Sequence, residues 1–368
     1  MSVLKLLTRM MQLSIKNIEF DHKTFTWRIF LISLSTLFSP FPSLTGRQFG
    51  CHWRDKKRGD YLRPKGTLVM WISLLCLQTF FLVGSAFYST DFTQWLDKHH
   101  TVGMRQWIER ADLKSTGSFG GRDYENQTLT HNPIVFVHGV SHTVGTMMKE
   151  AANHFKWKGN YTDAELYGTT YDNPRGDKMK WMQYKMSCDH VKRIRFMIEM
   201  VYEYTGRQVD VVAFSLGVPI SRKAILGGNC VDTNEFIGPS ITHKMGTYVG
   251  VSGPNKGVAP VMMGIPYALC AMSPLIPVCN PIDGLFSGFC PFKSRFINNI
   301  NSVQKYEGQH VYSIGSTMDE VVGHMICMEV TTRIGGQQGE KMYKDQKHDA
   351  TFRSSFDIQL AMLSGQPF

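Results

Sequence analysis

The sequence predicts an α/β fold, with a mostly parallel central sheet and helices on both of its faces. Two observations predict it. From about residue 130 onward, short apolar runs alternate with longer segments of helical periodicity, which is typical of parallel strands joined by crossover helices. Several of these runs, such as "VDVVAF" at 209–214, contain almost no polar residue. This composition fits strands that are buried on both faces.

The individual elements follow from the same periodicity. The expected strands are 132–139, 165–171, 208–214, 244–253 and 309–316. The expected helices are 145–157, 180–204, 216–228 and 320–334. The second of these helices places Ile194, Met197, Ile198 and Val201 on one face, which we expect to be buried. In sheets of this kind, reactive groups gather outside the carboxyl ends of the strands.

Positive charge is concentrated at the start of the chain. The net charge is +10, but residues 1–66 carry 12 Lys/Arg against 4 Asp/Glu, which leaves 28 against 26 for the remainder. We therefore expect no nucleic-acid partner for the folded body. Residues 1–66 are expected to be a disordered basic segment or a gene-model extension, and residues 88–368 to form one domain.

An uncharged apolar segment at 67–87 separates these two parts. It is long enough to cross a bilayer about 30 Å thick as a helix. One interpretation is a signal-anchor with the preceding basic residues in the cytoplasm. The other, which we favour, is a cleaved signal peptide that starts at Met70 and ends in the small residues 84–86. Both place residues 88–368 in the secretory lumen, as a secreted protein or a single-pass membrane protein.

Sequons and cysteines agree with a lumenal domain. "NQT" at Asn126 and "NYT" at Asn160 are N-glycosylation sequons. Six cysteines follow residue 87, namely Cys188, Cys230, Cys270, Cys279, Cys290 and Cys327. An even number predicts disulfides but allows 15 pairings, and buried free thiols are the alternative. The sequence has no CxxC and no HExxH motif, so we expect no metal site.

The stretch "VDVVAFSLGVPISRKAIL" at 209–226 is the first candidate for chemistry. An expected strand reaches Ser215 and a helix leaves it at once, which forces a cramped turn whose flanking residues must be small. Ala213 and Gly217 occupy those positions. A nucleophilic serine here would meet the unpaired Leu216 N–H at the helix start, a suitable oxyanion donor. The alternative is an ordinary serine at the end of a strand.

A second candidate is "IVFVHGVSH" at 134–142. Serine hydrolases of this architecture build the other half of the oxyanion hole after such a strand. Gly139 would let the backbone turn so that the Val140 N–H points to the site. For His138 the commoner role is structural, with its ring hydrogen-bonded to the backbone of this loop.

A nucleophilic serine needs a histidine base and a carboxylate that orients it. Asp319 follows the strand at 309–316, with Glu320 as the runner-up, and His348 follows a short expected strand near the end of the chain. This gives the order serine, acid, histidine that is usual in this architecture. The weaker histidine candidates are His243, His310 and His324, the last of which falls in the expected helix 320–334.

An apolar insertion at 257–292 follows the strand after Ser215. It carries one charge, Asp283, and three of the six cysteines. We interpret it as a lid or an acyl-chain wall over the site, with a simple core role as the alternative.

Taken together, these motifs resemble the class 2 lipases. The resemblance rests on "PIVFVHGVSH", "ELYGTTY", the segment around Ser215, "GPNKG", "STMDEVVG" and "KHDATF", and spans roughly residues 95–365. The nearest pattern is that of secreted nematode lipase-like proteins, which are related to small bacterial lipases with an Ala-x-Ser-x-Gly turn.

The resemblance implies an α/β-hydrolase that cleaves carboxylic esters of lipids, with triacylglycerol lipase as the family label. Ser215 would be the nucleophile, Asp319 the acid and His348 the base, with Val140 and Leu216 as oxyanion donors. The expected partner is a lipid ester, dissolved or at a lipid–water interface, and neither a cofactor nor an obligate protein partner is expected. The alternatives are an inactive lipid-binding relative and an acyltransferase or thioesterase on the same scaffold.

Overall fold

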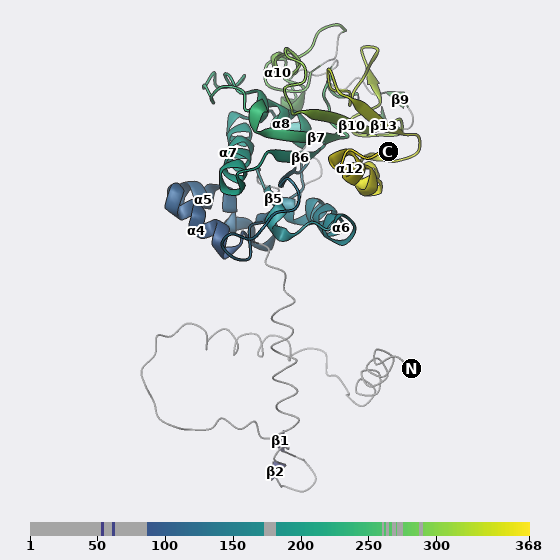
Figure 1. Cartoon of the computed structure of the whole chain (residues 1–368). Helices are drawn as coiled ribbons and strands as arrows, with labels where there is room; N and C mark the ends of the chain where they lie inside the picture. The colour runs from purple at the N-terminus through teal and green to yellow at the C-terminus, as the bar shows by residue number, and fades with distance from the viewer. Residues whose placement is uncertain are drawn as a thin grey trace, which may run out of the picture. The chain divides into compact units, whose positions relative to one another are not determined.

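The computed structural model describes residues 87–172, 182–259, 261–262, 265–266, 270, 275–286 and 290–368, together with 53–54 and 61–62 (Figure 1). In the N-terminal unit, β1 (Trp53–Arg54) and β2 (Tyr61–Leu62) form an antiparallel pair. The rest of the basic segment 1–66, and the apolar segment 67–87 up to residue 86, lie outside the described residues. No helix within the described part of the chain is long and apolar enough to span a membrane.

The described domain is built around a seven-stranded sheet, and its strands occur in the order β13-β10-β7-β6-β4-β5-β3. The strands are β3 (Ser118–Phe119), β4 (Ile134–Val137), β5 (Leu166–Thr169), β6 (Val209–Phe214), β7 (Met245–Val251), β10 (His310–Ser316) and β13 (Gly339–Tyr343). All neighbours pair in parallel except β3, which is antiparallel to β5. The predicted mostly parallel sheet is therefore confirmed.

Helices cover both faces of this sheet. They are α4 (Thr90–His99), α5 (Val102–Glu109), α6 (Lys149–Gly159), α7 (Cys188–Thr205), α8 (Gly217–Leu226), α10 (Arg295–Ile300), α11 (His348–Ser354) and α12 (Phe356–Leu363). Short helical turns occur at Ala111–Thr116, Val144–Met148, Asp163–Glu165, Thr242–Lys244 and Pro277–Cys279. α7 and α8 lie on one side of the sheet, and α6 and α12 on the other (Figure 1).

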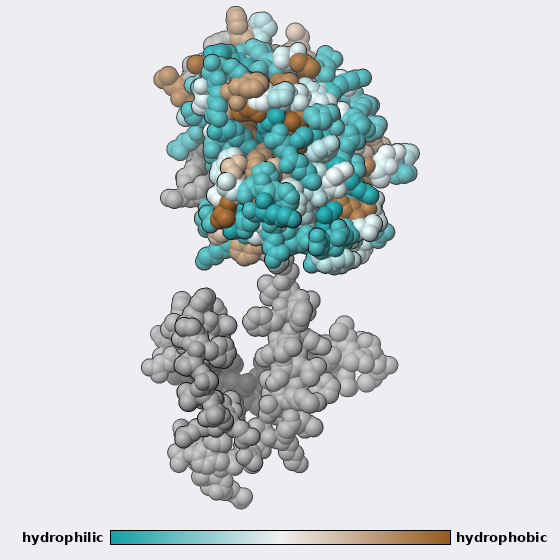
Figure 2. Space-filling view, turned by 60° about the vertical axis from the view of Figure 1, so that its left-hand side comes forward, coloured by the Kyte–Doolittle hydropathy of each residue, from teal (hydrophilic) through white to brown (hydrophobic). Residues whose placement is uncertain are grey.

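Alternate residues of the central strands feed the two core layers, as the period of two in a strand requires. Val135 and Val211 belong to the cluster on the α7–α8 side, whereas Phe136 and Phe214 belong to the cluster on the α6–α12 side. The predicted buried face of α7 is confirmed, since Ile194, Met197, Ile198 and Val201 are fully buried. Much of the outer surface is hydrophilic on the face that Figure 2 shows, with small separate hydrophobic groups.

The helix predicted over 320–334 is wrong. This segment forms turns and a hairpin of β11 (Met325–Ile326) and β12 (Glu329–Val330). Cys327, at the tip of the hairpin, has a φ of 49° and is joined by a disulfide to Cys290. Left-handed backbone does not occur within a right-handed helix, so the apolar spacing in this segment misled the prediction.

Three disulfides join the six cysteines, as Cys188–Cys230, Cys270–Cys279 and Cys290–Cys327. Two of them begin in the insertion 257–292, where β8 (Val261–Met262) pairs with β9 (Ile265–Pro266). Val278 and Leu285 of the insertion are buried, whereas Leu275 and Phe292 are largely exposed. The described part of the insertion therefore contributes to the core and also presents apolar side chains to solvent.

Candidate active site

Ser215 lies at the junction between β6 and α8, at the carboxyl edge of the central strand. Its φ is 52°, a left-handed conformation that costs a non-glycine residue about 1–2 kcal/mol. Its N–H donates to the Val251 carbonyl at 2.8 Å, which holds the turn against β7. A Cβ at Gly217 would lie 2.4 Å from the His138 oxygen, so α8 can start here only with glycine. Ala213 is fully buried within β6, where its methyl group is accommodated.

His348 and Asp319 reach Ser215 from two other strand ends. Nε2 of His348 lies 2.9 Å from Oγ of Ser215, and Nδ1 lies 2.8 Å and 3.0 Å from the Asp319 carboxylate oxygens. All three side chains are buried. Asp319 follows β10, and His348 begins α11 just after β13. The topology thus brings a serine, a histidine and an aspartate into one hydrogen-bonded chain.

The environment of Asp319 keeps its carboxyl group ionised. Burial by itself would raise the pKa of Asp319, but the charge and hydrogen bond of His348 oppose it. The N–H groups of Val322 and Val321 also donate to Oδ1, at 2.9 Å and 3.0 Å. The net result is a pKa below its usual value. An ionised Asp319 accepts the Nδ1–H of His348 and leaves Nε2 free to accept a proton from Ser215.

Glu320, the other acid candidate, contacts His348 differently. Its Oε2 accepts the backbone N–H of His348 at 3.0 Å, at the start of α11. Within the described residues, none of His243, His310 and His324 hydrogen-bonds to Ser215. His243 and His310 are exposed, and His324 lies in the turn before β11 rather than in a helix.

The loop after β4 approaches Ser215 closely. A Cβ placed on Gly139 would lie 2.9 Å from Cβ of Ser215, so only glycine allows this contact. Among the described residues, the N–H groups of Val140 and Leu216 donate to no protein acceptor. One follows Gly139 and the other follows Ser215. Two unpaired donors on the two segments that meet at the serine are what an oxyanion site requires.

His138, the first residue after β4, holds the start of this loop in place. Its Nε2 accepts the Tyr171 N–H at 3.2 Å, so its Nδ1 carries the proton and donates to the Gly139 carbonyl at 2.7 Å. The rings of His138 and Tyr171 also stack, with their centroids 4.2 Å apart. Burial lowers the pKa of His138 to about 3, so the ring is neutral near pH 7. The sequence analysis did not single out Tyr171, although its place at the end of the expected strand 165–171 was a usable signal.

Two further residues of the site were not predicted. His142, at the end of the loop after β4, lies 3.7 Å through Nε2 from Oδ1 of Asp349. Asp349 is the neighbour of His348 in the sequence. Nothing in a linear motif indicates this contact, because it depends on how β4 and β13 are placed in the sheet.

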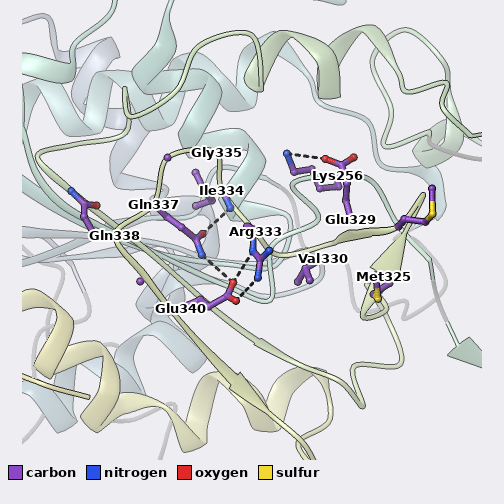
Figure 3. A pocket seen from close by; sticks show the side chains of 13 residues that line it. Lys256, Met325, Glu329, Val330, Arg333, Ile334, Gly335, Gln337, Gln338 and Glu340 are labelled. Carbon is purple, nitrogen blue, oxygen red and sulfur yellow. Dashed lines mark hydrogen bonds and ion pairs between the residues drawn. The ribbon is translucent and has the colours of Figure 1, made fainter.

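A separate cavity of about 670 Å³ opens beside the hairpin and the start of β13 (Figure 3). Its charged groups are already paired: Lys256 lies 3.4 Å from Glu329, and Arg333 donates to Glu340. Gln337 also donates to Glu340. None of the three hydrogen-bonded residues around Ser215 lines this cavity. The cavity is therefore distinct from the site at the carboxyl edge of the sheet.

The described residues contain one cluster of three metal-capable side chains, formed by Cys188, Cys230 and Asp232. Its two cysteines are joined in a disulfide. Both sequon asparagines are exposed: Asn126 lies in a loop with a φ of 63°, and Asn160 ends α6 with a φ of 55°. Their exposure makes them accessible to a glycosylating enzyme.

The fold, with its strand-to-helix turn at the central strand, is that of the α/β-hydrolases. The family model for class 2 lipases matches residues 131–361, more than half of the chain. The chain belongs to the class 2 lipase family. No curated protein matches the sequence.

Solved structures with a similar fold include two lipases. The mature form of Bacillus licheniformis lipase BlEst2 is 17% identical, with a TM-score of 0.44 and coverage of 67% of this chain and 97% of the other. Aspergillus fumigatus lipase B is 14% identical, with a TM-score of 0.46 and coverage of 70% and 58%.

Proposed function

We propose that the protein hydrolyses carboxylic esters of lipids, as a triacylglycerol lipase or esterase, through an acyl-enzyme on Ser215. The observation that carries the proposal is the hydrogen-bonded chain from Ser215 through His348 to Asp319. Membership of the class 2 lipase family supports lipid esters as the substrate class. Catabolism of lipids is the process in which such an activity takes part.

The chemistry follows from this geometry. Nε2 of His348 takes the Ser215 proton while Oγ attacks the ester carbonyl, and Asp319 stabilises the imidazolium that forms. The N–H groups of Val140 and Leu216 stabilise the oxyanion; in another serine hydrolase, loss of one such donor costs about 10²–10³ in kcat. His348 then protonates the leaving alcohol, and a water molecule activated by the same ring releases the fatty acid. This reaction needs no cofactor.

The apolar insertion is proposed to select lipid esters. Its exposed Leu275 and Phe292 and its disulfide-tied chain are suited to a lid or acyl-chain wall. Polar substitution of these two residues then lowers kcat/KM for long-chain esters more than for short-chain esters. Equal losses for both chain lengths would argue against this role.

We also propose that the domain acts outside the cytosol, as a glycosylated secreted protein. Three disulfides and two exposed sequons support this location. Treatment of the protein from a eukaryotic host with an N-glycosidase lowers its mass if Asn126 or Asn160 is modified. An unchanged mass would contradict the glycosylation.

Ester hydrolysis is tested with the purified protein on triacylglycerol emulsions and on esters of increasing chain length. The proposal predicts release of free fatty acid by wild type and none by Ser215→Ala. A parallel assay with an added acyl-accepting alcohol separates hydrolysis from acyl transfer. Binding of lipid without turnover would instead indicate an inactive relative.

A further inference from the structure

The loop that carries Val140 is a strained turn, and its C-terminal end at His142 must be held in place. The His142 N–H donates to the Gly139 carbonyl at 3.4 Å, which closes a turn with Val140 and Ser141 at its centre. Ser141 has a φ of 62°, a conformation that this position normally reserves for glycine. Such strain persists only where the surroundings fix it. The direction of the Val140 N–H therefore depends on how firmly His142 is held.

His142 is held from two directions. Its ring packs edge-on against Phe214, with centroids 6.1 Å apart. Its Nε2 lies 3.7 Å from Oδ1 of Asp349. Phe214 is fully buried and also packs against the His348 ring, with centroids 4.9 Å apart. His142 and His348 are thus connected in two ways. Phe214 contacts both rings, and Asp349, which contacts His142, is the next residue after His348 in the sequence.

We propose that His142 and Asp349 are a positioning pair that sets the Val140 N–H relative to the Ser215–His348 couple. The pair acts through the loop and through α11 rather than by touching the substrate. This inference rests on the proposed ester hydrolysis. Preorganised N–H donors stabilise the oxyanion of the transition state more than they stabilise the bound substrate. Loss of the pair therefore lowers kcat more than it changes KM.

The charges around Asp349 agree with this role. The neighbouring His142 ring lowers the pKa of the Asp349 carboxyl, with further contributions from His348 and Arg353. Arg353 is itself paired with Glu150, at 2.7 Å. The Asp349 carboxylate is therefore ionised at neutral pH and able to attract a donor from His142.

The chain offers a matched control pair. His154 and Asp357 form a second histidine–aspartate contact, 2.8 Å long, between α6 and α12. Side-chain exposures of 23% and 55% in this pair compare with 26% and 52% for His142 and Asp349. His154→Ala reports what losing a surface histidine–aspartate contact does to stability, whereas Asp357→Ala also removes the ion pair of Asp357 with Lys158.

The experiment is a double-mutant cycle on the purified protein. It compares His142→Ala, Asp349→Ala and their combination, with the same three variants at His154 and Asp357. The readouts are kcat and KM for a soluble ester, the rate of labelling by a fluorophosphonate, and the melting temperature. His142→Gln is included because its side-chain amide can still donate to Asp349.

The proposal predicts that each single variant lowers kcat and the labelling rate by roughly tenfold, with KM within about twofold. The combined variant is then no worse than either single variant, because both remove the same interaction. His142→Gln recovers part of the loss, and the control variants leave kcat unchanged.

Two results would overturn the pairing in a wild-type protein that reacts with the fluorophosphonate. One is a wild-type kcat in His142→Ala, and the other is a combined variant whose loss is the product of the two single losses. A folded wild type that does not react would overturn the proposed hydrolysis, and this inference with it.

Discussion

Nε2 of His348 lies 2.9 Å from Oγ of Ser215, although 133 residues separate them in the chain. The sheet order explains the contact. β6 is central, and β10 and β13 lie on one side of it beyond β7. Because these strands are parallel, their carboxyl ends meet at one edge. A nucleophile after β6, an acid after β10 and a base after β13 then converge there.

The two neighbouring acids are expected to differ greatly in their effect on catalysis. Asp319→Asn removes the charge that orients and stabilises the His348 ring, and should lower kcat by on the order of 10³–10⁴. Glu320→Ala removes one hydrogen bond to the His348 backbone and should cost no more than about tenfold. Steady-state kinetics of both variants check this. A larger loss in Glu320→Ala would reassign the acid.

The small residues on either side of Ser215 are expected to differ in how much their substitution disturbs the turn. Gly217→Ala forces a methyl group against the backbone of the loop after β4, and should destabilise the fold by about 1–3 kcal/mol or prevent the turn. Ala213→Gly should keep its activity and lose about 0.5–1 kcal/mol of stability. Urea unfolding measures the stability of both variants, and an ester assay measures their activity. An active and stable Gly217→Ala would contradict the tight approach.

His138 is expected to make the fold sensitive to acid. Its folded pKa of about 3 lies below the ordinary 6.5. Its contribution to stability is therefore present above pH 6.5 and is lost as the pH falls through about 3, at up to about 1.4 kcal/mol per pH unit. Unfolding of wild type and His138→Gln at pH 7, 5 and 4 measures this. Parallel pH profiles in the two proteins would show that folding does not lower the pKa of His138.

Asp210 is expected to give the opposite pH dependence. Burial raises its pKa to about 7, although the Thr247 N–H donates to it at 2.6 Å. Stability linked to its neutral form is complete below pH 3.8 and is lost as the pH rises through about 7. Asp210→Asn should therefore raise the melting temperature at pH 8 and leave it nearly unchanged near pH 4. A variant that gains nothing at pH 8 would contradict this.

The sequence predicted the parallel core and the order of the candidate residues, because buried strands and the turn at Ser215 are local patterns. It did not predict the antiparallel strand β3, which is only two residues long. The helix α7 begins at Cys188 and not at the predicted residue 180. Short elements and element ends carry too little periodicity to be recognised.

The larger failure, at 320–334, has a long-range cause. Gly323 has a φ of 78° and packs against the backbone of Ala259, and a disulfide joins Cys327 to Cys290. Neither constraint is visible in the spacing of apolar residues. The same reason explains why the contact between His142 and Asp349 and the three cysteine pairings could not be predicted.

Covalent labelling by a fluorophosphonate tests the central proposal most directly. Intact-mass measurement and peptide mapping of the folded protein should find a single adduct on Ser215. The adduct should be absent from Ser215→Ala and form much more slowly in Asp319→Asn. A folded wild-type protein that forms no adduct, or that forms it on another residue, would contradict the assignment of Ser215 as the nucleophile.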